Sequence, residues 1–431
     1  MLSWLTTDSS SSSNSKIGKR RFYYGWVVLA TCLIFVTITY GIRFSFGVFF
    51  KSLEQEFDWT RAMTSGVFSV YMLLGSLFAI LGGWAVDRYG AKIVFILMGV
   101  FAFLGMSLTS QANEPWHLFV SYSLLVAMGT GATYAISVAM ASRWFTERRG
   151  LASAIVTSGV GLGTILMAPI ADYLISGYGW RTSYLVIGVI ALIITIPCSL
   201  LLKRAPSETA GEHPETVNLD TSERRSSNEV KEFSPLQAAK TRNFWLFISI
   251  WFLYAFCLFT ITTHIVRHAI DLGTASMQAA SIISISGFAN IPGRILMGIA
   301  SDRFGRKRMA VICCLVMAGA MLWLTESSSL WMLYLFAAAF GAAYGALAPP
   351  TIAIVGDTFG LRHIGAIFGI LEIGWVSGAA VGPFLAGYIF DITGSYYLAF
   401  LLGMVAALMM VILVLLLRIP TAKTRNKLSS R

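Results

Sequence analysis

The chain has 431 residues, of which 56% are hydrophobic and only 12% carry a charge. Its mean hydropathy of +0.71 excludes a water-soluble globular domain, because such a domain would have to expose a large apolar surface. The net charge of +11 is scattered over short loops, which argues against nucleic-acid binding and predicts a membrane protein with basic loops.

The chain begins with a polar tail that contains the run SSSSSNSKIGKRR. This run lacks the short apolar region and the small-residue cleavage site of a signal peptide. We therefore expect residues 1–22 to be a cytoplasmic tail, and the first apolar segment to remain in the mature protein.

Twelve apolar stretches follow, each long enough to cross roughly 30 Å of hydrocarbon as a helix. The sequence therefore predicts an all-α polytopic membrane protein with twelve transmembrane helices. The stretches are centred in 24–48, 62–85, 92–111, 116–141, 150–175, 182–202, 243–266, 277–300, 309–325, 330–353, 364–389 and 396–417.

A polar segment rich in Ser, Thr, Glu and Pro lies between the sixth and seventh stretches, at residues 204–241. A segment of this length and composition is typical of a linker. It divides the chain into two predicted six-helix bundles, residues 23–203 and 242–418, with a second tail at 419–431. Most of the 32 basic residues fall on one side if both tails and the linker are cytoplasmic, which fixes the orientation and favours the plasma (inner) membrane.

The five cysteines all lie in apolar segments without the spacing of metal ligands. They are typical of small core residues. The sequence also lacks a placed nucleophile and base or a nucleotide loop, so we expect no cofactor, no metal and no enzyme activity.

The two halves repeat each other. The loop GGWAVDRYGAK at 82–92 matches MGIASDRFGRK at 297–307, and GATY at 131–134 matches GAAY at 341–344. Parallel repeats of this kind are how many transporters hold a substrate between halves that move around it.

The duplicated G-x-x-x-D-R-x-G-x-[RK] loop resembles the signature of the major facilitator superfamily, and the resemblance covers residues 23 to 418. The segment WFTERRGLASAIVTSGVGLG at 144–163 resembles the fifth-helix signature of the monocarboxylate porter branch and its oxalate/formate antiporter relatives. YYGWVV at 23–28 and FDITGSY at 390–396 are also similar to this branch.

The loop motifs place Asp87, Arg88, Asp302 and Arg303 where the second and eighth helices end. An aspartate there accepts hydrogen bonds from the N-terminus of a neighbouring helix and pairs with a basic residue. Two interpretations remain open, a gate that locks the cytoplasmic side and a purely structural turn. Both predict that these residues do not touch substrate.

Arg294 stands inside an apolar run, about one turn from the expected midplane near Ile291. An arginine at that depth costs at least about 2.5–3.5 kcal/mol on insertion scales, so it should face a cavity or a partner. The corresponding residue of the first half is Ala79, so the helix–loop architecture does not require the charge. Substrate binding is the favoured interpretation, and a structural buried pair is the alternative.

The resemblance supplies a substrate class. In the monocarboxylate porters an arginine of the eighth helix, preceded by an aspartate one turn earlier and a phenylalanine two residues before that, binds the substrate carboxylate and couples it to a proton. The matching residues are Phe288, Asn290 and Arg294. The guanidinium fork that suits a carboxylate is kept, but the amide of Asn290 cannot take up a proton.

The family also has a lysine in the outer half of the first helix, where this chain has Phe44 with Arg43 beside it. Arg43 lies near the expected outer boundary of the membrane. Two roles remain open there, structural anchoring with the charged group reaching the interface (snorkelling) and attraction of anions. A second cation in the eleventh helix, as in the dicarboxylate-exchanging relatives, is absent. One deep arginine favours a monoanion over a dianion.

Glu372 is an acid near mid-depth in the eleventh helix. It could pair with Arg294, accept the transported proton, or remain protonated and hydrogen-bond across helices. His264, in the outer part of the seventh helix, is a second candidate for proton coupling, although a satisfied interface residue is the commoner case.

Tyr40, Tyr134 and Tyr344 lie on the first, fourth and tenth helices, which line the cavity in this fold, and they are candidate hydroxyl donors. The sequence thus favours a secondary active transporter for a small monocarboxylate, coupled to protons, that works by alternating access. The alternatives are an oxalate/formate type exchanger, a carrier of another organic solute, or a membrane sensor. The expected partners are an organic anion, a proton and the lipid bilayer.

Overall fold

The computed structural model describes residues 24–145, 149–203, 233–360 and 364–418. Over these ranges the chain is almost entirely helical and contains no β-strand, because a chain in hydrocarbon must satisfy its backbone polar groups within each segment. The helices of the first half are α1 (Gly25–Phe57), α2 (Arg61–Tyr89), α3 (Ala91–Ser110), α4 (Pro115–Leu118), η1 (Phe119–Val126), α5 (Ala127–Thr130), α6 (Thr133–Trp144) and α7 (Arg149–Leu200). Those of the second half are α9 (Pro235–Ala239), α10 (Arg242–Asp271), α11 (Ser276–Phe304), α12 (Arg306–Thr325), α13 (Leu330–Phe359), α14 (Ile364–Thr393) and α15 (Tyr397–Leu416).

Eleven helices within the described ranges are long and apolar enough to cross a membrane. The predicted spans 150–175 and 182–202 both fall in α7, which consists of two helices joined across a kink at Gly179 (φ 78°, ψ 162°). The fourth span combines α4, η1, α5 and α6. The prediction of an all-α polytopic membrane protein is confirmed.

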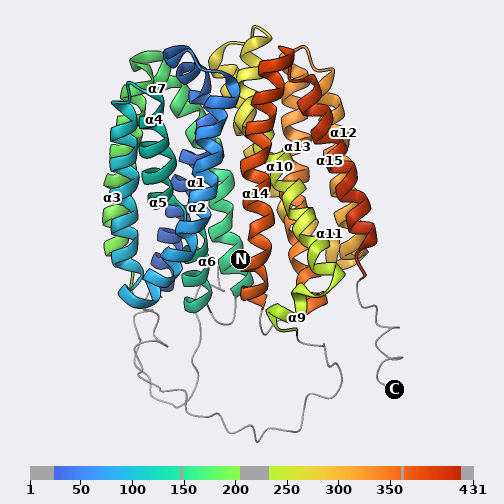
Figure 1. Cartoon of the computed structure of the whole chain (residues 1–431). Helices are drawn as coiled ribbons and strands as arrows, with labels where there is room; N and C mark the ends of the chain where they lie inside the picture. The colour runs from blue at the N-terminus through green and yellow to red at the C-terminus, as the bar shows by residue number, and fades with distance from the viewer. Residues whose placement is uncertain (1–23, 146–148, 204–232, 361–363, 419–431) are drawn as a thin grey trace, which may run out of the picture.

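The helices of the first half stand on one side of the molecule and those of the second half on the other (Figure 1). The halves meet where α2 packs on α14, α7 on α11 and α1 on α10. We call the end at which α1 begins and α15 ends the terminal end. The opposite end, where α1 ends at Phe57, is called the closed end.

The glycine of the repeated loop motif has the same role in both halves. Gly90 (φ 84°, ψ 152°) caps the end of α2, and Gly305 (φ 96°, ψ 126°) caps the end of α11. Only glycine adopts this part of backbone space without strain. The shared geometry explains why both copies of the motif carry glycine at this position.

Four charged side chains join the halves at the closed end. Glu54 on α1 accepts from Arg267 on α10, with Oε2 2.7 Å from Nε, and from Arg61 on α2, with Oε1 3.3 Å from Nε. The Nη1 atom of Arg61 lies 2.7 Å from Oδ2 of Asp271, and Asp271 also pairs with Arg267. Each half therefore contributes a cation and an anion to one network.

Asp391, from the FDITGSY motif, adds a second link between the halves. Its Oδ1 accepts from the backbone N–H of Arg61 at 2.8 Å, and its Oδ2 accepts from that of Ala62 at 2.7 Å. These N–H groups have no partner within α2, so a residue at the end of α14 caps a helix of the other half. We call Glu54, Arg61, Arg267, Asp271 and Asp391 the closed-end cluster.

Below this cluster α1 and α10 come into backbone contact at Gly47. A methyl group added to Gly47 would lie 2.5 Å from the Thr262 carbonyl oxygen and 3.1 Å from that of Thr263. Small residues permit such close approach between membrane helices. Contact between main chains leaves no room for a solute to pass between α1 and α10 at this level.

Gly47→Ala should loosen the closed end, because the added methyl meets backbone atoms that cannot rotate away. We expect a severalfold faster reaction of a Thr263→Cys side chain, buried in the parent, with a water-soluble maleimide in protein whose native cysteines are replaced. Gly83→Ala is the matched control, since its methyl would meet nothing within 4 Å. Equal labelling rates in the Gly47 and Gly83 variants would show that this contact does not seal the closed end.

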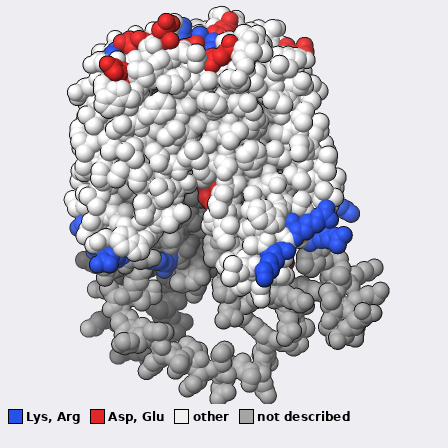
Figure 2. Space-filling model, in the orientation of Figure 1, with Lys and Arg blue, Asp and Glu red and all other residues white. Residues whose placement is uncertain are grey.

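The surface agrees with a protein embedded in lipid. On the face in view a broad band has almost no charged side chains, with acidic groups gathered at the closed end and basic groups toward the terminal end (Figure 2). Between the halves the surface is hollowed toward the terminal end, and one acidic group shows at mid-height (Figure 2). The structure is thus sealed at one end and open between its halves at the other.

Candidate functional site

The candidate residues lie on helices that pack around the interface of the two halves. Arg294 is roughly 15 Å along α11 from its end at Phe304, and Arg43 is roughly 27 Å along α1 from its start at Gly25. Both side chains are partly buried. Each half therefore places one guanidinium at depth.

Arg294 interacts electrostatically with tyrosines of both halves. Its charge acts electrostatically on Tyr134 of the first half and on Tyr254 and Tyr344 of the second. The Nε of Arg294 is buried and has no hydrogen-bond partner among the described residues. A buried charged donor without a partner is costly, so this atom is suited to an acceptor supplied by a ligand.

Asn290, one turn before Arg294, lies in the interface of α11 with α13. It is only 2% exposed, and its side chain packs directly against Gly345. Its Nδ2 also lacks a hydrogen-bond partner within the described ranges. The predicted neighbour of the arginine is thus a buried amide pressed against a helix backbone, while Phe288 is exposed.

Arg43 does not extend to the outer boundary, so the snorkelling interpretation is wrong. Its guanidinium carbon lies 4.7 Å from the ring centre of Tyr40 and 5.7 Å from that of Tyr71. The reason is that α1 continues to Phe57, nine residues past the end of the predicted stretch at residue 48. Arg43 consequently lies near the middle of α1 and belongs to the candidate site.

Aromatic side chains line the space around Arg43. Tyr40 meets Tyr134 edge to face and also contacts Phe44, with ring centres 5.9 Å apart in each pair. Tyr134 is 37% exposed, whereas Phe44 is buried and stacks on Phe259 of α10 at 6.1 Å. The predicted wall residues Tyr40, Phe44 and Tyr134 are therefore brought together.

Three aromatic residues of the second half complete this wall and were not predicted. Phe259 packs edge to face against Trp375 at 5.7 Å, and Trp375 packs against Tyr254 at 5.2 Å. The Tyr254 hydroxyl donates to the backbone carbonyl of Tyr344. No spacing in the sequence separates these residues from the many aromatic residues that only pack between helices.

Glu372 is exposed on α14, although it lies within a membrane span. It interacts electrostatically with Arg43, Tyr40 and Tyr134. Within the described part of the chain no ion pair joins it to Arg294. The cation whose charge acts on Glu372 is Arg43 of the opposite half, and this interaction was not among the predicted ones.

His264 lies outside this group and is fully buried. Its Nε2 is 2.8 Å from the Pro383 carbonyl oxygen, which can only accept, so Nε2 carries the hydrogen. In the neutral ring Nδ1 then accepts from the Tyr396 hydroxyl at 3.0 Å. Both nitrogens are used in packing α10 against α14 and Tyr396, which favours the role of a satisfied interface residue over proton coupling.

The predicted gating loops lie at the terminal end, far from this site. Arg88 is exposed, and its guanidinium lies over Trp84 at 5.8 Å and Tyr89 at 5.7 Å. Arg303 is also exposed at the end of α11. The side chains of Asp87 and Asp302 lie outside the described residues.

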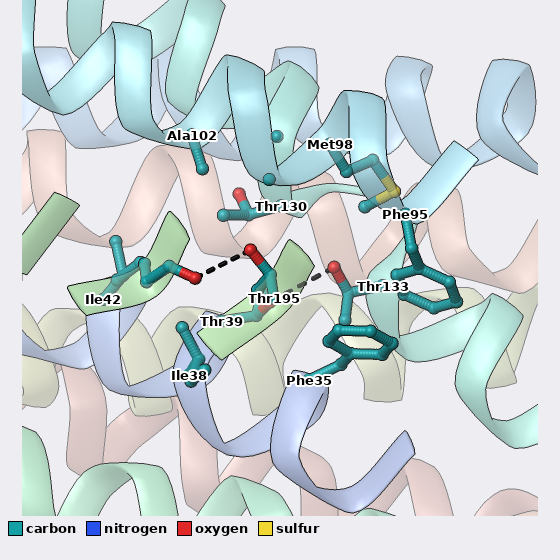
Figure 3. Close-up of a pocket in the computed structure, with 13 residues that line it drawn as sticks. Phe35, Ile38, Thr39, Ile42, Phe95, Met98, Ala102, Thr130, Thr133 and Thr195 are labelled. Carbon is teal, nitrogen blue, oxygen red and sulfur yellow. Dashed lines mark hydrogen bonds between the residues drawn. The ribbon is translucent and has the colours of Figure 1, made fainter. Parts of the chain in front are cut away.

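A small cavity inside the first half is separate from the candidate site (Figure 3). It is lined by apolar side chains of α1 and α3 and by threonines whose hydroxyls are already bonded. Thr39 donates to Thr133 at 3.1 Å, and Thr195 donates to the Ala191 carbonyl at 2.7 Å. Without a charged group or a free hydroxyl in view, this cavity is a packing defect within one half.

The described residues contain no cluster of side chains that could hold a metal ion. The site instead offers two guanidiniums, one carboxyl group and several tyrosine hydroxyls between two halves of a helical membrane protein. Such a set can bind an anionic solute through charge-assisted hydrogen bonds.

Comparisons with known proteins agree with this architecture. The chain is 28% identical to monocarboxylate transporter 12 of Homo sapiens over 405 residues, which is 88% of this chain and 77% of that protein. It is 26% identical to monocarboxylate transporter 13 of Rattus norvegicus over 389 residues, covering 88% and 86%. A solved bacterial homologue of the human lysosomal transporter Spinster, in an inward-facing and unoccupied conformation, has the same fold, with a TM-score of 0.69, 14% identity and coverage of 92% and 96%.

The family model of the Major Facilitator Superfamily matches residues 29–299 and 268–431, which together span nearly the whole chain. The members of this superfamily are transporters and not enzymes. The chain belongs to the Major Facilitator Superfamily.

Proposed function

We propose that this transporter moves a small monocarboxylate, of the size of lactate or pyruvate, by alternating access. The observation that carries the proposal is Arg294, a charge at depth whose buried Nε has no partner among the described residues. A carboxylate would supply the missing acceptor and take two bonds from the guanidinium fork. The names of the relatives, monocarboxylate transporters 12 and 13, support this class of substrate.

The charges of the site favour one negative charge on the substrate. Arg43 and Arg294 contribute two positive charges and Glu372 one negative charge when ionised, so the described site has one net positive charge. The sequence predicted a monoanion from one deep arginine, Arg294. The site with two arginines and one acid predicts the same substrate charge. A dianion would fit only with Glu372 protonated.

The closed and open ends support alternating access around this site. In the present conformation a solute can approach between the halves from the terminal end, while the closed-end cluster and the Gly47 contact block the other side. Release to that side requires these contacts to separate and the terminal end to close. Two halves that rock around a central site make this exchange without unfolding.

An exchanger that swaps one anion for another is the second candidate. Asn290 favours it, because the amide lies where the resemblance implies a proton-accepting acid. Proton coupling then depends on another acid, and Glu372, on which the charge of Arg43 acts, is our candidate. Dependence of uphill uptake on a pH gradient separates the two candidates.

We also propose that the terminal end, with both tails and the 204–241 linker, faces the cytoplasm. The basic groups near that end (Figure 2) support this orientation through the positive-inside rule. We expect a cysteine at Arg308, exposed at the start of α12, to react with an impermeant maleimide only from the cytoplasmic side, and one at Glu326, exposed at its other end, only from outside. The reverse pattern in intact cells would overturn the orientation.

The function is tested with purified protein in proteoliposomes. Counterflow with radiolabelled lactate, pyruvate, formate, oxalate and a sugar should show exchange of the small monocarboxylates and none of the sugar. Empty liposomes and liposomes with Arg294→Gln serve as controls. Transport of the sugar with no transport of any acid would overturn the proposed substrate class.

A further inference from the structure

Arg43 is linked to a chain of hydrogen bonds that runs through the interior of the first half. Its Nε lies 3.5 Å from the hydroxyl of Tyr71 on α2. That hydroxyl is 2.9 Å from Oγ1 of Thr130 at the end of α5. Thr130 in turn donates to the backbone carbonyl of Val126 at 2.8 Å.

The direction of every bond in this chain is fixed by its ends. Arginine Nε–H can only donate, and the Val126 carbonyl can only accept. Thr130 uses its hydrogen on Val126, so its oxygen accepts from the Tyr71 hydroxyl. The Tyr71 oxygen is then left to accept from Arg43, and all three bonds are satisfied at once.

The surrounding packing holds this chain in place. Tyr71 is 1% exposed and Thr130 is 2% exposed. Next to them, Gly131 and Gly75 bring α5 and α2 into backbone contact. Val126 is the last residue of the π-helix η1, and π-helical turns are often found at functional sites.

We infer that Tyr71 and Thr130 are positioning residues for substrate binding, an inference that rests on the proposed function. They hold the Nε of Arg43 in the protein, while its guanidinium carbon lies 4.7 Å from the ring centre of Tyr40. The two terminal nitrogens are left for the anion, so the arm that the first half offers is set before the substrate arrives. Pre-orientation of this kind improves affinity because less freedom is lost on binding.

The test compares Tyr71→Phe and Thr130→Val with a matched control. Tyr122→Phe is the control, because Tyr122 packs against Tyr71 with ring centres 5.3 Å apart and its buried hydroxyl has no partner among the described residues. Initial rates of lactate and pyruvate uptake are measured in proteoliposomes after each variant has been shown to be monodisperse. We expect the KM to rise about threefold to tenfold in Tyr71→Phe and Thr130→Val, with kcat nearly unchanged, because Arg43 loses its pre-orientation but keeps its own bonds to the substrate. Thr130→Ser, which keeps the hydroxyl, should restore the parent KM.

A double-mutant cycle separates positioning from general loosening. Arg43→Met leaves no N–H to donate to Tyr71, so adding Tyr71→Phe to Arg43→Met should weaken substrate binding no further. A parent protein that transports neither acid overturns the proposed function and this inference with it. If the parent transports these acids, two results overturn this inference alone. One is a KM in Tyr71→Phe and Thr130→Val equal to that of Tyr122→Phe. The other is additive effects in the double-mutant cycle.

Discussion

Arg294→Lys should lower the affinity for a monocarboxylate about tenfold or more, although the charge is kept. Lysine offers a point charge in place of the planar fork, so the substrate loses one of two parallel charge-assisted bonds. A bond of this class contributes roughly 1.5–3 kcal/mol, which corresponds to about 10- to 100-fold in the dissociation constant. Arg294→Gln, which also loses the charge, should abolish measurable counterflow.

The matched control for this experiment is Arg308→Lys, since Arg308 is exposed in the first turn of α12. All variants are compared by counterflow and by the lactate-dependent shift of the melting temperature. The Arg294 variants should melt near the parent temperature without substrate, because no described partner is lost, and should lose the shift. An Arg294→Lys protein with the parent's affinity would make Arg294 a structural residue.

Glu372→Gln should keep substrate exchange and abolish uphill uptake driven by an inward proton gradient. In the empty carrier Arg43 of the other half is the cation whose charge acts on Glu372. A substrate carboxylate that binds the arginines brings one negative charge into the site, and Glu372 then loses its cationic partner. A proton taken up by Glu372 brings one positive charge, so the net charge of the loaded site equals that of the empty site. Such coupling makes the fully loaded carrier, and not the half-loaded one, the form that changes face.

The measurement is accumulation of labelled lactate in proteoliposomes at equal and unequal pH, next to counterflow at constant pH. Glu326→Gln is the control, because Glu326 is exposed at the end of α12. A Glu372→Gln carrier that still concentrates lactate in response to a pH gradient would exclude Glu372 as the coupling acid. Loss of both exchange and accumulation in Glu372→Gln would assign Glu372 to substrate binding.

The sequence predicted the parts of this protein that depend on length and apolar character. Long apolar runs must become helices in hydrocarbon, and the repeated loop marked equivalent places in the two halves. Depth was predicted well for Arg294, where the helix end was marked by the D-R-x-G loop. It was predicted poorly for Arg43, because the polar end of α1, residues 51–57, continues as helix beyond the apolar run.

Partners across the halves could not be predicted in the same way. The electrostatic interaction of Glu372 with Arg43 acts between α14 and α1, and the hydrogen bonds of His264 depend on Tyr396 and Pro383. Both depend on how helices far apart in the sequence are rotated about their axes. Hydropathy gives the span of a helix, but its rotation is set by packing details such as the close contact at Gly47.

The charges of the closed-end cluster affect how a solute is admitted from that side once the halves separate. Glu54 and Arg61 then remain on one rim and cancel, while Arg267, Asp271 and Asp391 remain on the other rim with one net negative charge. This mouth has no positive excess to draw anions in from bulk water, so it cannot accelerate their entry by long-range attraction. On the proposed function, anions are selected over other solutes only at Arg43 and Arg294. We therefore expect the vestibule on this side to admit solutes of either charge, and the central site to set the specificity.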